Sequence, residues 1–139
     1  MQISPNYAEV YKNRGYAHYK LGNWQSAIAD YNEVVRINPN HASAYYNRGL
    51  AHDKLGNWQS AIADYNEVVR INPNHASAYY NRGLIRSKLG DKRGAIADYT
   101  ETVRINPNDA KAYKSRGNAR SNLGDWQGAI ADYDRASAN

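Results

Sequence analysis

The chain has 139 residues, the length of one ordinary domain, and its 18 Lys and Arg against 13 Asp and Glu give a net charge of +5. This charge suits an acidic partner, but the basic residues are spread along the chain rather than gathered into the dense run typical of a nucleic-acid binder. The absence of cysteine excludes a disulfide framework, a thiolate nucleophile and a cysteine-based zinc site.

The chain is built from an internal repeat. The segment at 20–50 recurs letter for letter at 54–84, which is an offset of 34 residues. We therefore divide the chain into four units: 8–41, 42–75, 76–109 and an incomplete 110–139. Residues 1–7 resemble the tail of a preceding unit, and we expect the whole chain, 1–139, to form a single domain.

Each unit predicts two helices, which in the first unit run over 8–21 and 24–37. Gly22 and its equivalents end the first helix, because glycine tolerates the left-handed cap conformation. Asn23, which becomes aspartate in the last two units, is placed to cap the second helix with its side-chain oxygen. Pro39 ends that helix, because the residue before a proline is pushed out of the α region.

The second helix of each unit has one apolar face. In the first unit this face consists of Trp24, Ala27, Ile28, Tyr31, Val34 and Val35. Their spacing of i, i+3, i+4 and i+7 is that of a helix with one buried side. A helix pair cannot bury such a face alone, whereas stacking on identical neighbours can. The predicted fold class is therefore all-α, an α-solenoid of stacked antiparallel helix pairs.

This pattern resembles the tetratricopeptide repeat (TPR) family. The period of 34 residues matches the family, and so do the recurring residues Tyr11, Gly15, Ala27, Tyr31 and Pro39. The resemblance covers nearly the whole chain and implies a right-handed superhelix, in which the first helices of successive units line a concave groove. It also implies a protein–protein interaction scaffold that binds a peptide segment or a partner protein in that groove.

The two most similar units, 8–41 and 42–75, differ only in the first helix. The differences are Glu9/Ser43, Val10/Ala44, Lys12/Tyr46, Tyr16/Leu50 and Tyr19/Asp53. Four of them fall on one helical stripe. Free drift of solvent-facing residues would have changed the second helix too, so the concentration favours a face that contacts a specific partner. The resemblance assigns the same stripe to the groove.

The predicted groove combines tyrosines, leucines and a row of lysines. Its residues are Glu9, Lys12, Tyr16, Tyr19, Lys20, Tyr46, Leu50, Asp53, Lys54, Tyr80, Leu84, Lys88, Lys111, Lys114 and Asn118. Such a surface suits a protein or peptide ligand with apolar anchors and some acidic residues, and tyrosine gives a large contact area with few torsions to freeze. The alternative is that these tyrosines only cover the groove floor.

A narrower subfamily pattern fits only in part. Some TPR proteins clamp the terminal carboxylate of chaperone tails with five residues from three successive units. Lys12 and Asn47 match that pattern, but Tyr16 stands in place of an Asn, and Ser77 and Asn81 stand in place of a Lys and an Arg. We therefore do not expect this chain to bind chaperone tails.

Two alternative functions remain open. Lysines interleaved with tyrosines can hold phosphates and stack bases, which allows an RNA-binding basic solenoid, although Glu9 and Asp53 on the same stripe argue against nucleic acid. Residues 3–7 match 37–41, and the chain stops soon after Tyr133 without a polar capping helix. This predicts a fragment of a longer array, or a structural array that self-associates end to end.

The sequence offers little for catalysis. His18 and His52 are copies of one repeat position, and His41 and His75 of another, so a solenoid would spread them apart and we expect no metal site. No catalytic spacing of Ser, His and Asp and no glycine-rich phosphate loop occurs, so we expect no enzyme activity, no catalytic residues and no cofactor. We find no signal-peptide core at the start and no window near the roughly 18 apolar residues of a membrane span, so we expect a cytoplasmic location.

An arginine recurs where the resembled family usually has leucine. Arg14, Arg48, Arg82 and Arg116 are each followed sixteen residues later by an aspartate. An unpaired buried charge would cost several kcal/mol, so we expect a bidentate Arg–Asp bridge within each helix pair. The glycine after each arginine lets the second helix approach closely.

Overall fold

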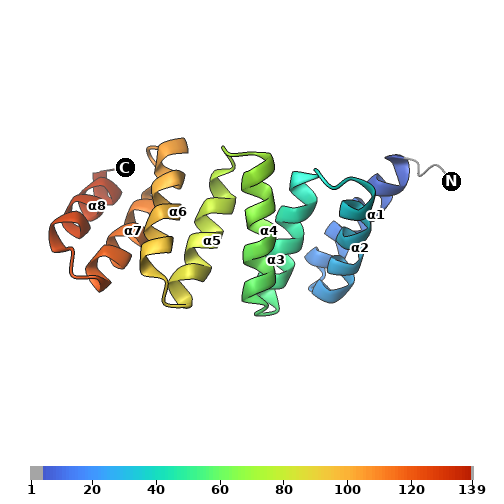
Figure 1. Cartoon of the computed structure of the whole chain (residues 1–139), viewed down its shortest axis with the longest axis horizontal. Helices are drawn as coiled ribbons and strands as arrows, with labels where there is room; N and C mark the ends of the chain where they lie inside the picture. The colour runs from blue at the N-terminus through green and yellow to red at the C-terminus, as the bar shows by residue number, and fades with distance from the viewer. Residues whose placement is uncertain (1–4, 139) are drawn as a thin grey trace. The chain divides into compact units, whose positions relative to one another are not determined.

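The computed structural model describes residues 5–138, which form eight α-helices and no strand (Figure 1). The helices are α1 Pro5–Lys20, α2 Trp24–Ile37, α3 Ala42–Lys54, α4 Trp58–Ile71, α5 Ala76–Lys88, α6 Lys92–Ile105, α7 Ala110–Asn122 and α8 Trp126–Ala138. Each unit of the repeat contributes one pair joined by a short turn. The all-α helix-pair fold predicted from the sequence is confirmed.

From here on each helix pair is called a repeat, and a unit is one of the two compact parts into which the chain divides. The first unit ends at Pro73 and the second begins at Asn74. In the first unit α1 pairs with α2 and α3 with α4, and α2 packs on α3 to join the two pairs. In the second unit α5 pairs with α6 and α7 with α8, and α6 packs on α7. The two first helices within each unit also touch, α1 with α3 and α5 with α7. These first helices therefore share one side of each unit.

The helix ends follow the predicted signals closely. α2 runs from Trp24 to Ile37 as expected, and the turn before it contains Gly22 with a φ of 80°. The equivalent glycines of the other three repeats also have positive φ, a conformation that favours glycine. One boundary differs. α1 begins at Pro5 instead of Ala8, because proline is tolerated in the first turn of a helix. The predicted tail of a preceding unit lies partly in residues 1–4, outside the described residues.

The two helices of a repeat meet at a glycine. A Cβ placed on Gly49 would lie 2.7 Å from Cε1 of Tyr65, and the equivalent glycines Gly83 and Gly117 are as tightly placed. Tyr65 is completely buried beside this glycine. The predicted close approach of the second helix is therefore present, and it positions the tyrosine at the centre of the repeat.

The predicted caps of the second helices form in only two of the four repeats. Asp91 accepts a hydrogen bond from the Gly94 amide at 2.9 Å, and Asp125 does the same for Gly128. The expectation is wrong for Asn23 and its equivalent in the second repeat, which make no side-chain cap bond. A Cβ on Gly94 would lie 2.7 Å from Cγ of Asp91. A serine occupies this position in the first two repeats, and the residue before the helix there is asparagine instead of aspartate.

Histidines cap two of the first helices, which the sequence reading missed. Nδ1 of His41 accepts from the Ala44 amide at 3.2 Å, and Nδ1 of His75 accepts from the Ala78 amide at 3.1 Å. Burial lowers the pKa of the His75 imidazole. In the last repeat Asp109 holds the equivalent position and makes the equivalent bond. These caps therefore require a neutral imidazole or a carboxylate.

The cap difference is testable with one matched pair of variants. Asp91→Ala should lower the free energy of unfolding by about 1 kcal/mol, because it removes a formed cap. Asn23→Ala is the control at the equivalent position, where no cap bond is lost, and it should change stability much less. Urea unfolding followed by circular dichroism measures both. Equal losses in the two variants would contradict the account.

The histidine cap should make stability depend on pH. The folded-state pKa of His75 is lowered, so its contribution is present above the unfolded-state value of about 6.5 and is lost as the pH falls through the folded-state pKa. His75→Asp should keep the cap and remove this loss. Thermal unfolding of both proteins between pH 8 and pH 5 tests it. Burial also lowers the pKa of His52, and His52 contributes the same pH dependence to both proteins.

Candidate functional site

Each helix pair is joined by the predicted bridge from an arginine to an aspartate. Nη2 of Arg48 on α3 lies 2.7 Å from Oδ1 of Asp64 on α4, and Nε donates to Oδ2 at 3.0 Å. The same bidentate pairing joins Arg14 to Asp30, Arg82 to Asp98 and Arg116 to Asp132. The aspartates are buried in all four repeats. The predicted bidentate bridge is therefore present in every helix pair.

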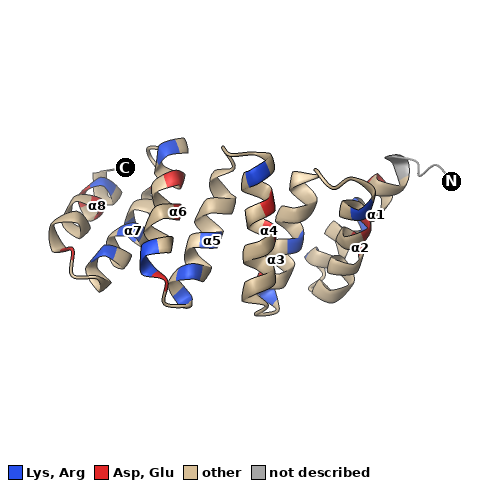
Figure 2. Cartoon of the chain, in the orientation of Figure 1, with Lys and Arg blue, Asp and Glu red and all other residues tan. Residues whose placement is uncertain are grey.

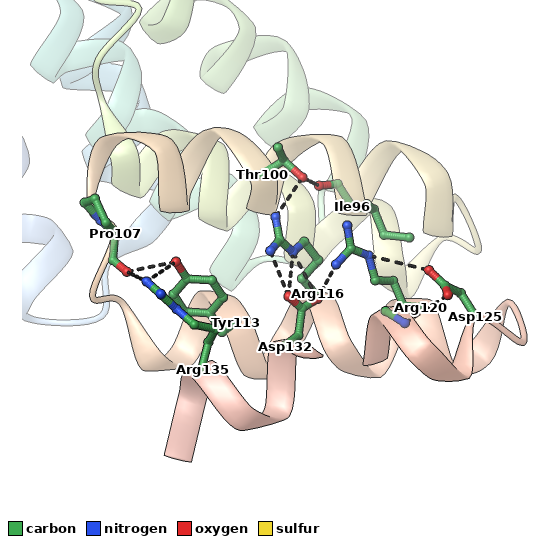
Figure 3. A network of polar contacts seen from close by, with 10 residues as sticks. Ile96, Thr100, Pro107, Tyr113, Arg116, Arg120, Asp125, Asp132 and Arg135 are labelled. Carbon is green, nitrogen blue, oxygen red and sulfur yellow. Dashed lines mark hydrogen bonds and ion pairs between the residues drawn. The ribbon is translucent and has the colours of Figure 1, made fainter. Parts of the chain in front are cut away.

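The bridge has further partners that differ along the chain. In the last repeat Arg120 donates a second hydrogen bond to Asp132 at 2.9 Å, and Arg116 also reaches Thr100 on the preceding helix pair at 3.2 Å (Figure 3). Arg86 adds the same second bond in the third repeat. In the first two repeats this position is a histidine. The later aspartates thus have two arginines each.

Each bridging arginine also lies over a tyrosine ring. The guanidinium carbon of Arg48 is 5.4 Å from the ring centre of Tyr45, and the other three repeats have the same contact. A cation above an aromatic face is stabilised by the ring quadrupole. Burial raises the pKa of the Asp64 carboxyl, while the hydrogen bonds and charge of Arg48 offset part of that rise. Arg48, Arg82 and Arg116, whose side chains are largely covered, are therefore committed to the fold rather than offered to a ligand.

A hollow opens between the first helices of the first unit. It has a volume of about 400 Å³ and is lined by Lys12, Asn13 and Tyr16 from α1 and by Ser43 and Asn47 from α3. Two of the predicted groove residues, Lys12 and Tyr16, lie on its wall. Their side chains have neighbours on the same helix: Nζ of Lys12 is 2.9 Å from Oε2 of Glu9, and Lys20 lies over the Tyr16 ring.

None of the fifteen predicted groove residues is buried, but several of them also support the core. The Tyr46 ring packs 6.0 Å from that of Tyr65, and Tyr19 packs against the core of the first repeats. Burial, followed by the charge of Asp53, raises the pKa of Tyr19. Tyr46 and Tyr19 are therefore half buried, while Glu9 and Lys54 are exposed.

The second unit repeats this arrangement with different polar contacts. The hydroxyls of Tyr80 on α5 and Ser115 on α7 are 3.0 Å apart, which links the two first helices. Leu84 packs against the core, while Lys88, Lys111 and Lys114 are exposed. Asn118 accepts a hydrogen bond from the hydroxyl of Tyr133 at 2.6 Å. Its amide oxygen is thus already used within the last repeat.

Asn13, Ser43 and Asn47 line the hollow but were missing from the predicted site. The comparison of unlike repeats could not single out Asn13 and Asn47, because asparagine is the same at 13, 47 and 81. A constant polar residue on a variable stripe would have been the signal for them.

Basic residues occur on every helix (Figure 2), so no single helix concentrates the positive charge.

A larger hollow, of about 670 Å³, lies on the second unit among Arg93, Ile96, Arg120, Leu123 and Asp125. Arg120 is already bonded to the buried Asp132, so its charge is occupied. Residues 5–138 contain no cluster of His, Asp or Glu that could hold a metal ion. Over the same residues no helix has the length and apolar character needed to cross a bilayer.

Comparison with known families shows what class of protein this geometry defines. Two profiles described as tetratricopeptide repeat match residues 12–76 and 76–109. The chain belongs to the TPR family. Members of this family generally serve as interaction scaffolds, and this chain has that architecture. The search of curated proteins returned no match.

Solved structures support the assignment. The chain is similar to the crystal structure of MamA, with 29% identity, a TM-score of 0.93 and coverage of 97% of this chain and 79% of that one. It is similar to the Arabidopsis OM64 TPR domain, with 30% identity, a TM-score of 0.78 and coverage of 82% and 94%. It is also similar to the first TPR of Spaghetti (RPAP3) bound to the HSP90 peptide SRMEEVD, with 26% identity, a TM-score of 0.83 and coverage of 89% and 98%.

The unequal pairing of the bridges leads to a stability prediction. Arg48→Ala should lower the free energy of unfolding by roughly 2–4 kcal/mol, because it leaves a buried carboxylate without its arginine. Arg116→Ala is the matched control and should cost less, since Arg120 still contacts Asp132. Both values come from urea unfolding at neutral pH.

The loss of stability in Arg48→Ala should depend on pH. Without Arg48 the folded-state pKa of Asp64 rises further above its unfolded value, so Arg48→Ala loses stability relative to wild type as the pH rises through that range. The gap between the two proteins should therefore shrink as the pH falls toward about 4. A gap that does not change with pH would show that the lost packing of the arginine, not the stranded charge, is responsible.

Proposed function

We propose that the groove between α1 and α3 binds an extended segment of a partner protein. The observation that carries this proposal is the hollow on which Lys12, Tyr16 and Asn47 converge from two successive first helices. Family membership supports it, because TPR scaffolds act through protein contacts. The proposed partner segment carries apolar anchors and some acidic residues.

The residues of the hollow have complementary roles in this proposal. The amides of Asn13 and Asn47 offer both donors and acceptors, which suits the backbone of an extended peptide. Tyr16 is half exposed and offers an aromatic surface for an apolar side chain. The ammonium of Lys12 pairs with an acidic residue of the peptide, exchanging its exposed contact with Glu9, which is worth little in water.

The proposed ligand differs from the one bound by the Spaghetti domain. That domain carries an HSP90 peptide, and the resemblance to clamp-type repeats predicts which residues such a peptide needs. Here Ser77 and Asn81 stand where a Lys and an Arg would be required. We therefore propose an internal acidic–apolar segment instead of a chaperone C-terminus. The alternative ligand, RNA, would need a denser basic surface than the mixed charges of these helices provide.

The experiment is a peptide-display selection against the whole chain, with affinities of selected and synthetic peptides measured by fluorescence anisotropy. Asn47→Ala should weaken the selected peptides about tenfold, because it removes one or two hydrogen bonds in a partly desolvated site. Asn23→Ala, an asparagine outside the hollow, is the matched control. Lys12→Glu should act most strongly on acidic peptides, and Arg36→Glu on α2 controls for its change in charge.

Two further probes, a chaperone-tail peptide and an RNA, decide between the alternatives. The peptide SRMEEVD should bind much more weakly than the selected peptides. Polyuridine RNA should bind weakly at moderate salt, and tight RNA binding with a steep loss on adding salt would instead support the nucleic-acid function. Selected peptides whose affinity is unchanged by both Asn47→Ala and Lys12→Glu would show that the groove is elsewhere.

A further inference from the structure

The outer side of α8 is an exposed apolar face. Trp126, Ile130 and Tyr133 are 64%, 60% and 38% exposed, and their spacing of i, i+4 and i+7 puts them on one side of the helix. In the first repeat the tyrosine equivalent to Tyr133 is Tyr31, which is completely buried. The face that buries Tyr31, between α2 and α3, therefore has an open counterpart on α8.

α1 has the matching exposed face. Val10, Arg14 and Ala17 lie on one side of this helix and are all exposed. Their equivalents on α3 are Ala44 and Ala51, which are completely buried, and Arg48, whose side chain is 19% exposed against 60% for Arg14. The residues that α3 uses to contact α2 are therefore open on α1.

The interfaces inside each unit show how two such faces fit. In the second unit Ala119 of α7 lies in one apolar cluster with Tyr99 and Ile96 of α6. In the first unit Ala44 of α3 lies in one cluster with Val34 of α2. If α8 packs on α1 in the same register, Ala17 of α1 lies against Ile130 and Tyr133 of α8. Val10 of α1 then lies against Ala136 of α8.

We propose that α8 of one copy of this chain packs on α1 of a second copy, in the register that joins α2 to α3. The side-chain sizes support this pairing. Inside the first unit the partners are Val34 and Ala44, a large residue on the second helix and a small one on the first. In the proposed interface the order is reversed, with Ala136 on α8 and Val10 on α1, so the total volume is conserved. Volume-conserving exchanges are the ones that packed interfaces tolerate best.

The charges on the two exposed faces are also complementary, which supports the pairing independently of side-chain size. Nη1 of Arg48 donates to Oδ1 of Asn32 across α3 and α2 at 3.0 Å, and Nη1 of Arg116 donates to the Thr100 hydroxyl at 3.2 Å. The residue of α8 at this repeat position is Asp134, which is exposed, and Arg14 uses only Nε and Nη2 on Asp30. Asp134 thus supplies a carboxylate to the arginine of the second copy, where the inner interfaces have a neutral acceptor. A charge-assisted bond is roughly twice as strong as a neutral one.

This interface is head to tail, so the two surfaces in contact are different. Each added copy leaves one α1 face and one α8 face open, and the assembly continues unless it closes into a ring. The groove between α1 and α3 is formed within one copy and is a separate surface. Self-association is therefore independent of the proposed peptide binding, and each can fail without the other.

The test uses two variants that each block one face. Ala17→Arg blocks α1 and Ile130→Arg blocks α8, and both positions are exposed, so both proteins should fold with unchanged circular dichroism. In sedimentation velocity over a roughly hundredfold concentration range, wild type should form dimers and larger species. Each variant alone should be monomeric, and an equimolar mixture should form a dimer and nothing larger. Gln127→Arg on α8 is the control, because the equivalent Gln25 on α2 stays exposed although α3 packs on α2.

Each other outcome contradicts the proposal. A wild-type chain that stays monomeric at every concentration has no such interface. If Ala17→Arg dimerises alone and Ile130→Arg does not, the contact joins two α8 faces, and the reverse result indicates two α1 faces. Asp134→Lys should weaken the mixed dimer by at least about tenfold, because it sets a cation against Arg14, while Asp134→Asn should weaken it only a few-fold. Equal effects of Lys and Asn would show that the residue does not meet Arg14.

Discussion

The second helix of each repeat carries a buried carboxylate that needs a cationic partner, and this requirement determines how the two helices of the repeat pack. The arginine that meets it spans the helix pair, stacks on a tyrosine three residues earlier and leaves the aspartate fully bonded. The glycine that follows lets the second helix come close enough for the bridge to form. Because Arg48 is directed between the helices, the residues two before and two after it, Tyr46 and Leu50, lie on the opposite side of α3. The proposed groove therefore depends on a pair of residues that does not line it.

The repeat also gives the molecule an internal reference. Contacts between neighbouring helix pairs occur inside each compact unit, so the environment of any residue can be compared with that of its equivalents. This comparison distinguishes an exposed residue whose equivalents are also exposed, such as Gln127, from one whose equivalents are partly buried, such as Ile130. It gives a physical basis for separating ordinary surface from a face that lacks its partner.

The sequence predicts those parts of the structure that depend on one or two residues in known relation. Glycine at the end of the first helix, proline after the second and the Arg–Asp pair all act through their own geometry, and each prediction is confirmed. The cap at Asn23 is not predictable in this way, because asparagine and aspartate occupy equivalent positions and only the aspartates make the bond. The hollow was found only in part. Comparing unlike repeats identified Lys12 and Tyr16, but it could not identify Asn13 and Asn47, which do not vary. Which tyrosines become half buried depends on packing between helices, which residue spacing alone does not define.

The number of arginines bonded to each buried aspartate differs between repeats, and this difference affects where the chain unfolds first. In a linear array of repeats, stability is close to a sum of local terms and contacts between neighbours. In the third and fourth repeats each buried aspartate bonds two arginines, whereas in the first and second it bonds one arginine and a histidine occupies the position of the other. Fraying should therefore begin at the first helix pair, where Arg14 is also the most exposed of the four bridging arginines. Amide hydrogen exchange along the chain would then show protection rising from α1 toward α6. The sequence is nearly periodic, but local unfolding would start at one end and proceed in one direction.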